Sequence, residues 1–359
     1  MEKLILSALE ITQFRNLAPL KIDPSDRFNV ISGRNGSGKT NLLEAIYFFS
    51  TLRSFRTLFR KEIIQDDQVE SKLFAQFMGA AAGVRLSIHL SHVSRVIKKD
   101  EKEISSLNDH FYNFPMVLFH PANMSLIQGG PKERRRFMDR ALFQADRVYP
   151  VVLADYNRAL SSRNALLKSR PSKSLLFPYD QQLANLGSRI VSARQDFIEK
   201  SGVLFSEALT GIGDGLVGSM IYRPDVPGDS SRFLEIMEKN YQRDLDRGFS
   251  GRGPHADELE ILVGDRPAKR FASQGQQRMA VLSMKIAEVM TLAGATQCIP
   301  ILLLDDISSE LDRDRNLALF SFLNEVGGQV FITTTHLDHV RLNNPRSDFL
   351  IDGGCLSAV

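Results

Sequence analysis

The residues from Gly33 to Thr40 read GRNGSGKT, which is the phosphate-binding pattern G-x-x-x-x-G-K-T. Its glycines allow backbone N–H groups to wrap a phosphate, and the helix expected to begin near Lys39 adds a positive dipole end. In such loops the lysine reaches the β- and γ-phosphates, and the Thr40 hydroxyl ligates Mg²⁺. The pattern also lies between an apolar strand and a helical run, as it must. The sequence therefore predicts a nucleoside triphosphate site made of Gly33, Arg34, Asn35, Gly36, Ser37, Gly38, Lys39 and Thr40.

Two further strand ends carry groups that suit this chemistry. Residues 300–306 read PILLLDD, a buried strand that ends in two carboxylates. We expect Asp305 to hold Mg²⁺ and Asp306 to polarise the attacking water. His336 follows the β run QVFITTT, where an imidazole could sense or stabilise charge on the γ-phosphate. Solvated strand-end acids and a structural histidine are the alternatives, and the phosphate loop favours the catalytic interpretation.

The segment SQGQQR at Ser273–Arg278 precedes a long helical run, so serine, glycine and amide groups stand at a helix start. A helix N-terminus binds anions through its free N–H groups. One triphosphate does not need two such helix ends in one chain. The simplest arrangement is that this end serves a nucleotide bound by a second subunit, and an ordinary N-capped helix is the alternative.

The composition is that of an ordinary globular protein, with 359 residues, 43% of them hydrophobic and 24% charged. This length predicts roughly two domains, or one large domain with an insertion. The two cysteines, Cys298 and Cys355, exclude a disulfide framework and a CxxC zinc site. The N-terminal apolar run is too short for a signal peptide, and no run of about 18 apolar residues predicts a membrane helix. We expect a cytoplasmic protein that does not associate with a membrane.

The order of the expected elements predicts an α/β fold interrupted by a helix-rich insertion. Short strands between Leu4 and Val30 lead into the phosphate loop and a helix, which is how a βαβ unit begins. Alternating polarity from Leu73 to His120 predicts antiparallel strands, and MVLFH at the end of this segment predicts a buried strand. Residues 131–211 predict a helical hairpin with a turn near 170–178. The α/β character returns at Asp257.

The order of phosphate loop, SQGQQR, LLLDD, SSELD and TTTH resembles that of ABC-type ATPases. The resemblance implies ATP and Mg²⁺ as ligands, with Thr40 and Asp305 on the metal and Lys39, Asp306 and His336 as catalytic residues. It also implies a signature that contacts the γ-phosphate of the partner subunit, and a D-loop. The signature comprises Ser273, Gln274, Gly275 and Gln276, and the D-loop comprises Ser309, Glu310, Leu311 and Asp312. No Q-loop residue is assigned, because the strand end at His120-Pro121 carries no glutamine.

Within this class the sequence is most similar to the RecF family, over nearly the whole chain. The resemblance is carried by ITQFRN, GGPKERRRFMD, GPH at Gly253–His255, and ASQGQQR through LLLDDISSELD. RecF sequences usually continue Arg-Asp-Asp after GPH, whereas this chain has Ala256-Asp257-Glu258. The resemblance implies an ABC-type P-loop ATPase lobe, a mixed sheet with helices, plus an inserted helix-rich second lobe. The ATPase lobe would comprise 1–120 and 251–359, and the helical lobe would comprise 121–250.

The resemblance to RecF implies recombinational repair and replication at single-strand gaps, with RecO and RecR as partners in placing RecA and a link to the SOS response. It further implies a homodimer that closes with ATP, clamps DNA and opens after slow hydrolysis, so a weak ATPase is expected. One alternative is an SMC-type protein scaffold that ATP switches without direct DNA contact. Another is a transporter ATPase subunit, but the 232 residues between Thr40 and Ser273 are too many for one.

Positive charge is concentrated between Pro131 and Lys173, where eleven Lys and Arg stand against four Asp and Glu. A basic face of this kind can track DNA phosphates. The alternative is a solvated face in which one arginine pairs with an acid such as Asp139. A second cluster consists of Arg53, Arg56, Arg60 and Lys61, which would lie on one face if this segment is helical. Neither cluster is accompanied by an aromatic stacking motif, so contacts to the backbone of gapped or double-stranded DNA are expected. The candidates are Arg53, Arg56, Arg60, Lys61, Arg134, Arg135 and Arg136.

Overall fold

The computed structural model describes the chain except for residues 80–82, 105–106, 307–312, 338–339 and 341–344. By packing, the chain divides into two units. The first unit joins Met1–Asn123 to Glu288–Val359, and the second unit is Met124–Ala287. The sequence instead predicts lobe boundaries at 120 and 250. The second boundary differs because strand β11 (Glu258–Val263) pairs with strand β10 (Gly218–Arg223) and so completes a sheet of the second unit.

A largely parallel sheet of six strands lies in the first unit, in the order β17-β16-β4-β15-β14-β9. Four of its strands are apolar runs that are buried along their whole length, as parallel strands covered on both faces are. The buried strands expected at MVLFH, PILLL and QVFITTT are confirmed. The strands are β4 (Phe28–Ser32), β9 (Met116–Phe119), β14 (Ile301–Asp305), β15 (Val330–Thr334), β16 (Arg346–Asp352) and β17 (Cys355–Ala358).

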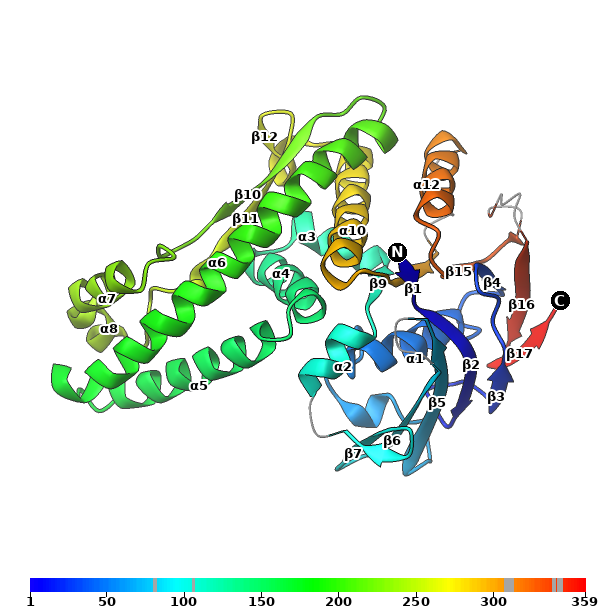
Figure 1. The fold of residues 1–359 in the computed structure, drawn as a ribbon, viewed down its shortest axis with the longest axis horizontal. Helices are drawn as coiled ribbons and strands as arrows, with labels where there is room; N and C mark the ends of the chain where they lie inside the picture. Colours follow the sequence, from blue (N-terminus) through cyan, green and yellow to red (C-terminus); the bar gives the residue numbers. More distant parts are fainter. Residues whose placement is uncertain (80–82, 105–106, 307–312, 338–339, 341–344) are drawn as a thin grey trace. The chain divides into compact units, whose positions relative to one another are not determined.

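A second sheet of six strands is antiparallel throughout, in the order β3-β2-β5-β6-β7-β8. Burial alternates along its strands, so one face meets the core and the other meets solvent. Helix α1 (Lys39–Thr51) shares one core cluster with strands of both sheets, and its residues 42–50 are all buried (Figure 1). The strands are β2 (Ile5–Thr12), β3 (Leu20–Ile22), β5 (Glu70–Met78), β6 (Val84–Ser91), β7 (Arg95–Lys99) and β8 (Lys102–Glu103).

The remaining elements of the first unit are short, apart from one helix. Strand β1 (Glu2–Lys3) pairs in parallel with β13 (Cys298–Ile299). The helices are α2 (Leu107–Asn113) and α12 (Arg313–Val326), with 3₁₀ turns at Arg60–Glu62 and Pro121–Met124.

The second unit is built on a helical hairpin, as the sequence predicts. Helix α5 (Tyr149–Leu167) runs along α6 (Lys173–Ile212), which Figure 1 shows as the longest helix of this unit. The turn is shorter than expected, because α6 begins at Lys173 and accommodates Pro178 near its start. The other elements are α3 (Ser125–Gln128), α4 (Pro131–Ala145), α7 (Ser230–Lys239), α8 (Tyr241–Arg247), α9 (Ala268–Phe271), β12 (Arg266–Pro267) and a 3₁₀ turn at Pro254–Ala256.

Helix α10 (Gln274–Thr296) is long and apolar enough to cross a membrane by length and composition alone, with a mean hydropathy of 1.3 over its most apolar window. However, 78% of that window is buried inside the protein. This burial is what a core helix of a globular protein shows, and it accounts for the apolar composition.

A buried network of charged groups joins several segments of the second unit. The guanidinium of Arg194, on α6, is 2% exposed and bonds the carboxylates of Asp257 at 2.7 Å and Asp139 at 2.8 Å. It also donates to the Pro254 carbonyl at 2.7 Å and to the Tyr149 hydroxyl at 3.1 Å. Buried acids need such a partner, because an uncompensated charge in the interior is unfavourable.

We predict that Arg194→Ala lowers the free energy of unfolding by about 3–5 kcal/mol, since it leaves Asp257 and Asp139 without their cation. Chemical denaturation followed by circular dichroism would measure the change. Arg189→Ala, an exposed position on the same helix, is the control and should change the stability by no more than about 0.5 kcal/mol. Equal effects of the two variants would contradict a structural role for the network.

Candidate functional site

Four neighbouring strands of the parallel sheet bring their carboxyl ends to one edge. In the order β4-β15-β14-β9, these strands run into the phosphate loop, His336, Asp305–Asp306 and His120. Ligands of open α/β sheets bind outside the carboxyl ends of the strands. The edge therefore gathers the candidate residues that lie far apart in the first unit's sequence.

The phosphate loop is wound tightly between β4 and α1. Gly33 and Gly38 have φ values of 156° and 118°, and a Cβ at Gly33 would collide with the carbonyl oxygen of Ile351 on β16. The Lys39 ammonium closes the loop by donating to the carbonyls of Gly33 at 2.7 Å and Arg34 at 3.0 Å. Burial lowers the pKa of Lys39, and the carboxylates of Asp306 and Asp305 oppose this shift.

A hydroxyl and a carboxylate meet beside the loop. The Thr40 hydroxyl donates to Asp305, with oxygen–oxygen distances of 2.9 and 3.1 Å. On the other side Thr333, in β15, donates to the same carboxylate at 2.8 Å and accepts the backbone N–H of Asp306 at 3.0 Å. Thr333 thus fixes both carboxylate residues, although the sequence analysis gave it no role. In the sequence, the only indication of this role was the position of Thr333 near the end of the β run QVFITTT.

His120 is a second residue that the sequence analysis left out. Its Nε2 lies 3.4 Å from an Asp305 oxygen, and its Nδ1 accepts the Ala122 N–H at 3.0 Å. The proton of the neutral ring is therefore on Nε2, facing the carboxylate. Burial lowers the pKa of His120 despite the opposing effect of Asp305, so the ring is neutral at pH 7. The end of the MVLFH strand was the signal, but only the sheet order places that end beside Asp305.

Glu44 on α1 is a buried carboxylate that connects the loop after α1 to the rest of the first unit. Arg15 bonds it in a fork, at 2.7 and 3.1 Å. The Ser54 hydroxyl also donates to Glu44, and the guanidinium of Arg56 lies 3.6 Å away. Because α1 also carries Lys39 and Thr40, residues 54–56 are connected mechanically to the phosphate loop.

The structure places the remaining predicted residues in different ways. His336 is exposed just beyond β15, where its backbone N–H and carbonyl both bond the Thr334 side chain, at 3.3 and 2.9 Å. The predicted D-loop residues Ser309, Glu310, Leu311 and Asp312 lie outside the described residues.

The predicted signature forms the start of α10, in the second unit. Ser273 and Gln276 make a reciprocal capping box, in which the Gln276 N–H donates to the Ser273 hydroxyl at 3.2 Å and the Ser273 N–H donates to Gln276 at 2.9 Å. Ser273 and Gln274 are exposed, whereas Gly275 and Gln276 are partly buried. The N-capped helix considered from composition is therefore present, and its exposed start remains a candidate anion site.

Comparison with known proteins identifies the class of this site. The family model described as RecF/RecN/SMC N terminal domain matches residues 5–346. A curated protein of Streptococcus thermophilus named DNA replication and repair protein RecF is 38% identical to this chain, over 98% of each. The chain belongs to the RecF family. A Myxococcus xanthus relative with the same name is 36% identical over 94% of this chain and 92% of its own.

Solved structures agree with this assignment. The structure titled recombination mediator protein RecF-ATP in RecFOR pathway has a TM-score of 0.91 and 29% identity, over 99% of this chain and 98% of its own. An SMC head domain of Pyrococcus furiosus has a TM-score of 0.59 at 17% identity, over 100% of this chain and 96% of its own, and shows a shared fold. The fold is thus an ABC-type ATPase lobe with an inserted helical lobe, as the sequence analysis expected.

Two basic residues that were proposed as DNA contacts from the local concentration of positive charge have partners within the protein. Arg134 is 8% exposed and forks onto both oxygens of Glu258 at 2.7 Å. Arg135 donates to the Asp257 carbonyl at 2.7 Å. Only Arg136 is exposed, 3.0 Å from Glu133. The prediction is therefore corrected for Arg134, because a DNA phosphate would have to break its forked pair with Glu258. Arg135 bonds the protein through one nitrogen only, and its contact with DNA stays a prediction.

The departure from the RecF pattern after GPH has a partial structural account. Asp257 is fully buried and accepts hydrogen bonds from Arg194, from Tyr222 and from the Asp225 N–H. Glu258 stands where RecF sequences usually have the second aspartate of Arg-Asp-Asp. Its side chain is longer by one methylene, and its carboxylate forms the forked pair with Arg134. Nothing in the structure explains the alanine at 256.

The segment that carries the second basic cluster is not a helix, although the cluster was expected to share one face only if it were. Helix α1 ends at Thr51, Leu52 adopts a left-handed φ of 53°, and only a 3₁₀ turn follows at Arg60–Glu62. Arg53, Arg56, Arg60 and Lys61 are exposed nonetheless. They therefore line a loop, and its base is attached to Glu44.

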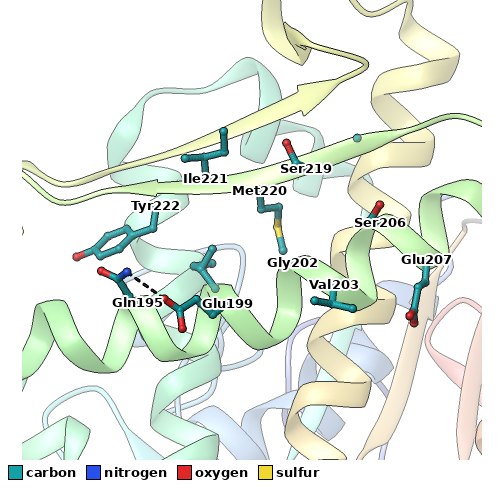
Figure 2. Close-up of a pocket in the computed structure, with 12 residues that line it drawn as sticks. Gln195, Glu199, Gly202, Val203, Ser206, Glu207, Ser219, Met220, Ile221 and Tyr222 are labelled. Carbon is teal, nitrogen blue, oxygen red and sulfur yellow. Dashed lines mark hydrogen bonds between the residues drawn. The ribbon is translucent and has the colours of Figure 1, made fainter.

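The second unit contains a groove of about 640 Å³. It runs between α6 and β10, and Figure 2 shows Gln195 bonded to Glu199 at one end, at 3.0 Å. Its charged side chains are the carboxylates of Glu199 and Glu207, and no predicted site residue lines it. Because these acids repel phosphate, we do not assign the nucleotide to this groove.

We predict that His120→Leu lowers ATP hydrolysis about tenfold and raises the Mg²⁺ concentration needed for half-maximal activity, because outer partners of a metal-binding carboxylate orient it. His120→Gln keeps an N–H donor near Asp305 and should lose less than about threefold. Steady-state phosphate release over a Mg²⁺ titration measures both. Equal losses in the two variants would show that the ring does not act by donating to Asp305.

Proposed function

We propose that this chain is a slow ATPase that uses ATP to control its binding to DNA in recombinational repair and replication. The observation that carries the proposal is the Thr40–Asp305–Thr333 constellation beside the Lys39 loop, at the carboxyl edge of the parallel sheet. The solved relative named RecF-ATP supports ATP as the nucleotide. The curated relatives named DNA replication and repair protein support the process.

The described residues fit ATP and Mg²⁺. Mg²⁺ prefers oxygen ligands, and Thr40 and Asp305 offer a hydroxyl and a carboxylate within hydrogen-bond distance of each other. The Ser37 hydroxyl is buried in the loop without a hydrogen-bond partner in the described structure, and phosphate oxygens would accept its proton. Lys39 would exchange its bonds to loop carbonyls for phosphate oxygens. When bound, Mg²⁺ neutralises charge between the phosphates.

Two residues would act around the γ-phosphate. Asp306 directly follows Asp305, the proposed metal ligand, and its backbone N–H donates to the Thr333 hydroxyl, which fixes the place from which its carboxylate would orient water. Its φ of 51° is unusual for a residue with a side chain, and such strain gathers at functional sites. His336, exposed at the next strand end, would stabilise transferred charge.

We propose further that ATP closes a homodimer. Ser273, at the exposed start of α10, would contact the γ-phosphate of a nucleotide held by the partner subunit, together with Gln274, Gly275 and Gln276. Hydrolysis is then slow, because both halves of each site must meet first. The partners RecO and RecR and a cytoplasmic location follow from the family, and a relative's title places that protein in the RecFOR pathway.

An SMC-type scaffold that ATP switches without DNA contact is the second candidate function. The pair of Arg134 with Glu258 favours it, because this pair removes one cation from the expected DNA surface. DNA contact therefore depends chiefly on the cations of residues 53–61 and on Arg135 and Arg136.

We predict that Ser273→Arg leaves ATP binding unchanged but abolishes ATP-dependent dimerisation, since its long cation would occupy the place of the partner's γ-phosphate. Lys39→Ala is the matched control, and it should lose both ATP binding and dimerisation. Fluorescent-nucleotide titration and light scattering measure the two properties. Loss of ATP binding in Ser273→Arg would mean that the signature does not act in trans.

DNA binding should tighten with ATP and depend steeply on salt. Each neutralised phosphate contributes about −0.9 to the slope of log K against log salt, so Arg60→Glu with Lys61→Glu should make the slope shallower by about two units. Titrations without nucleotide, with ADP and with ATP, each over a salt series, measure this. Weak DNA binding that is the same without nucleotide, with ADP and with ATP would favour the SMC-type scaffold.

A further inference from the structure

The loop from Leu52 to Ile63 has a fixed base. Leu52 is 2% exposed and Ile63 is 3% exposed, so both ends are buried in the core of the first unit. The Phe55 ring makes edge contacts with Tyr47, at a centroid distance of 5.8 Å, and with His120, at 4.9 Å. The loop therefore leaves the C-terminal end of α1 in one defined direction.

The loop gathers cations that the described protein does not neutralise. Arg53, Arg60 and Lys61 are exposed, and no ion-pair partner is found for them among the described residues. Arg95, from β7, stands beside them and donates to the Leu52 carbonyl. Its pKa is lowered by burial and further by the like charges of Arg60 and Arg53. Mutual repulsion of this kind makes the cluster a receptor for an anion.

The tip of the same loop presents two adjacent apolar side chains to solvent. Leu58 is 83% exposed and Phe59 is 68% exposed. The Phe59 N–H donates to the Thr57 hydroxyl at 3.1 Å, and its carbonyl accepts the Glu62 N–H at 3.1 Å. These bonds hold the backbone of the tip while the ring points away from the core. The sequence analysis found no aromatic stacking motif beside either basic cluster, but the structure leaves the single ring of Phe59 exposed within this one.

A flat aromatic ring among cations fits one part of a nucleic acid better than any other. Phosphates would satisfy the arginines, whereas the ring requires an apolar flat surface. Bases within a duplex already cover both faces by stacking, but an unpaired base exposes them, and aromatic side chains of single-strand-binding proteins use those faces. Double-stranded DNA would thus engage the cations alone.

We propose that Phe59, with Leu58 beside it, stacks on an unpaired DNA base while Arg53, Arg60 and Lys61 hold the adjoining phosphates, so that this loop favours gapped DNA over duplex DNA. The inference rests on the proposed function, since it requires DNA binding. It adds a nucleobase site to what was expected to be contact with the backbone alone.

The chain contains no tryptophan, which allows a direct test in the full-length protein. In Phe59→Trp the single indole should be quenched by gapped DNA in the presence of ATP, and not by duplex DNA of the same length. Val93→Trp is the matched control, because Val93 is 88% exposed on the hairpin between β6 and β7 of the same unit. Its fluorescence should respond to neither DNA.

Affinities supply the second measurement. Phe59→Ser should weaken binding to gapped DNA about tenfold and leave duplex binding within about twofold, whereas Phe59→Tyr should retain the wild-type preference. Phe59→Leu should behave like Phe59→Ser if the flat ring is what matters. Fluorescence anisotropy with labelled DNA of each kind measures these values.

Several results would overturn the inference. Quenching of Phe59→Trp by duplex DNA as strong as that by gapped DNA would mean that no unpaired base is bound. Gapped DNA that binds without quenching would mean that the tip does not touch it. Loss of ATP-dependent dimerisation in Phe59→Ser would assign the tip to a second copy of the chain. A wild-type protein that binds neither DNA would instead overturn the proposed function, and the inference with it.

Discussion

The Asp305 carboxylate is held between two hydroxyls, Thr40 on one side and Thr333 on the other, and this depends on parallel strand pairing. Only with β15 between β4 and β14 do the phosphate loop and the acidic strand end face each other across one intervening strand. The burial of these strands, which are apolar along most of their length, serves the same end, because covered faces fix the register. A polar site of a few groups thus requires an extensive apolar sheet behind it.

Local patterns in the sequence were sufficient to predict some parts of the fold and of the site. The phosphate loop, the acidic strand end and the helical hairpin each depend on residues close together in the chain, and the structure has them in the expected elements. His120 and Thr333 could not be assigned in that way. Both lie at ends of apolar strands that are recognisable as strands, but their neighbours are set by sheet order. Strand order depends on contacts between residues more than 300 positions apart, such as those that pair β4 with β15 and β16, which no local pattern encodes.

The arginines illustrate the same limit in terms of charge. The segment 131–173 is basic when counted alone, yet Arg134 and Arg163 bond acids that lie outside it. Arg163 is fully buried between Asp180 and Asp244. Folding neutralises these cations, because a buried guanidinium is stable only with partners. The loop at 53–61 shows the opposite behaviour. It carries fewer basic residues than the segment 131–173, yet its cations remain exposed in the folded protein.

The contact between the phosphate loop and β16 has a consequence for how the protein forms in the cell. The Gly33 backbone lies against Ile351, and Gly354 bonds Ser37 and Ala18, so residues synthesised more than 300 positions later complete the loop. At about 5–20 residues per second, the ribosome needs roughly 15–60 s between the two segments. During that interval β4 lacks both of its neighbours, β15 and β16. The nascent first segment therefore exposes apolar strand edges, which makes it a natural client for chaperones that bind growing chains.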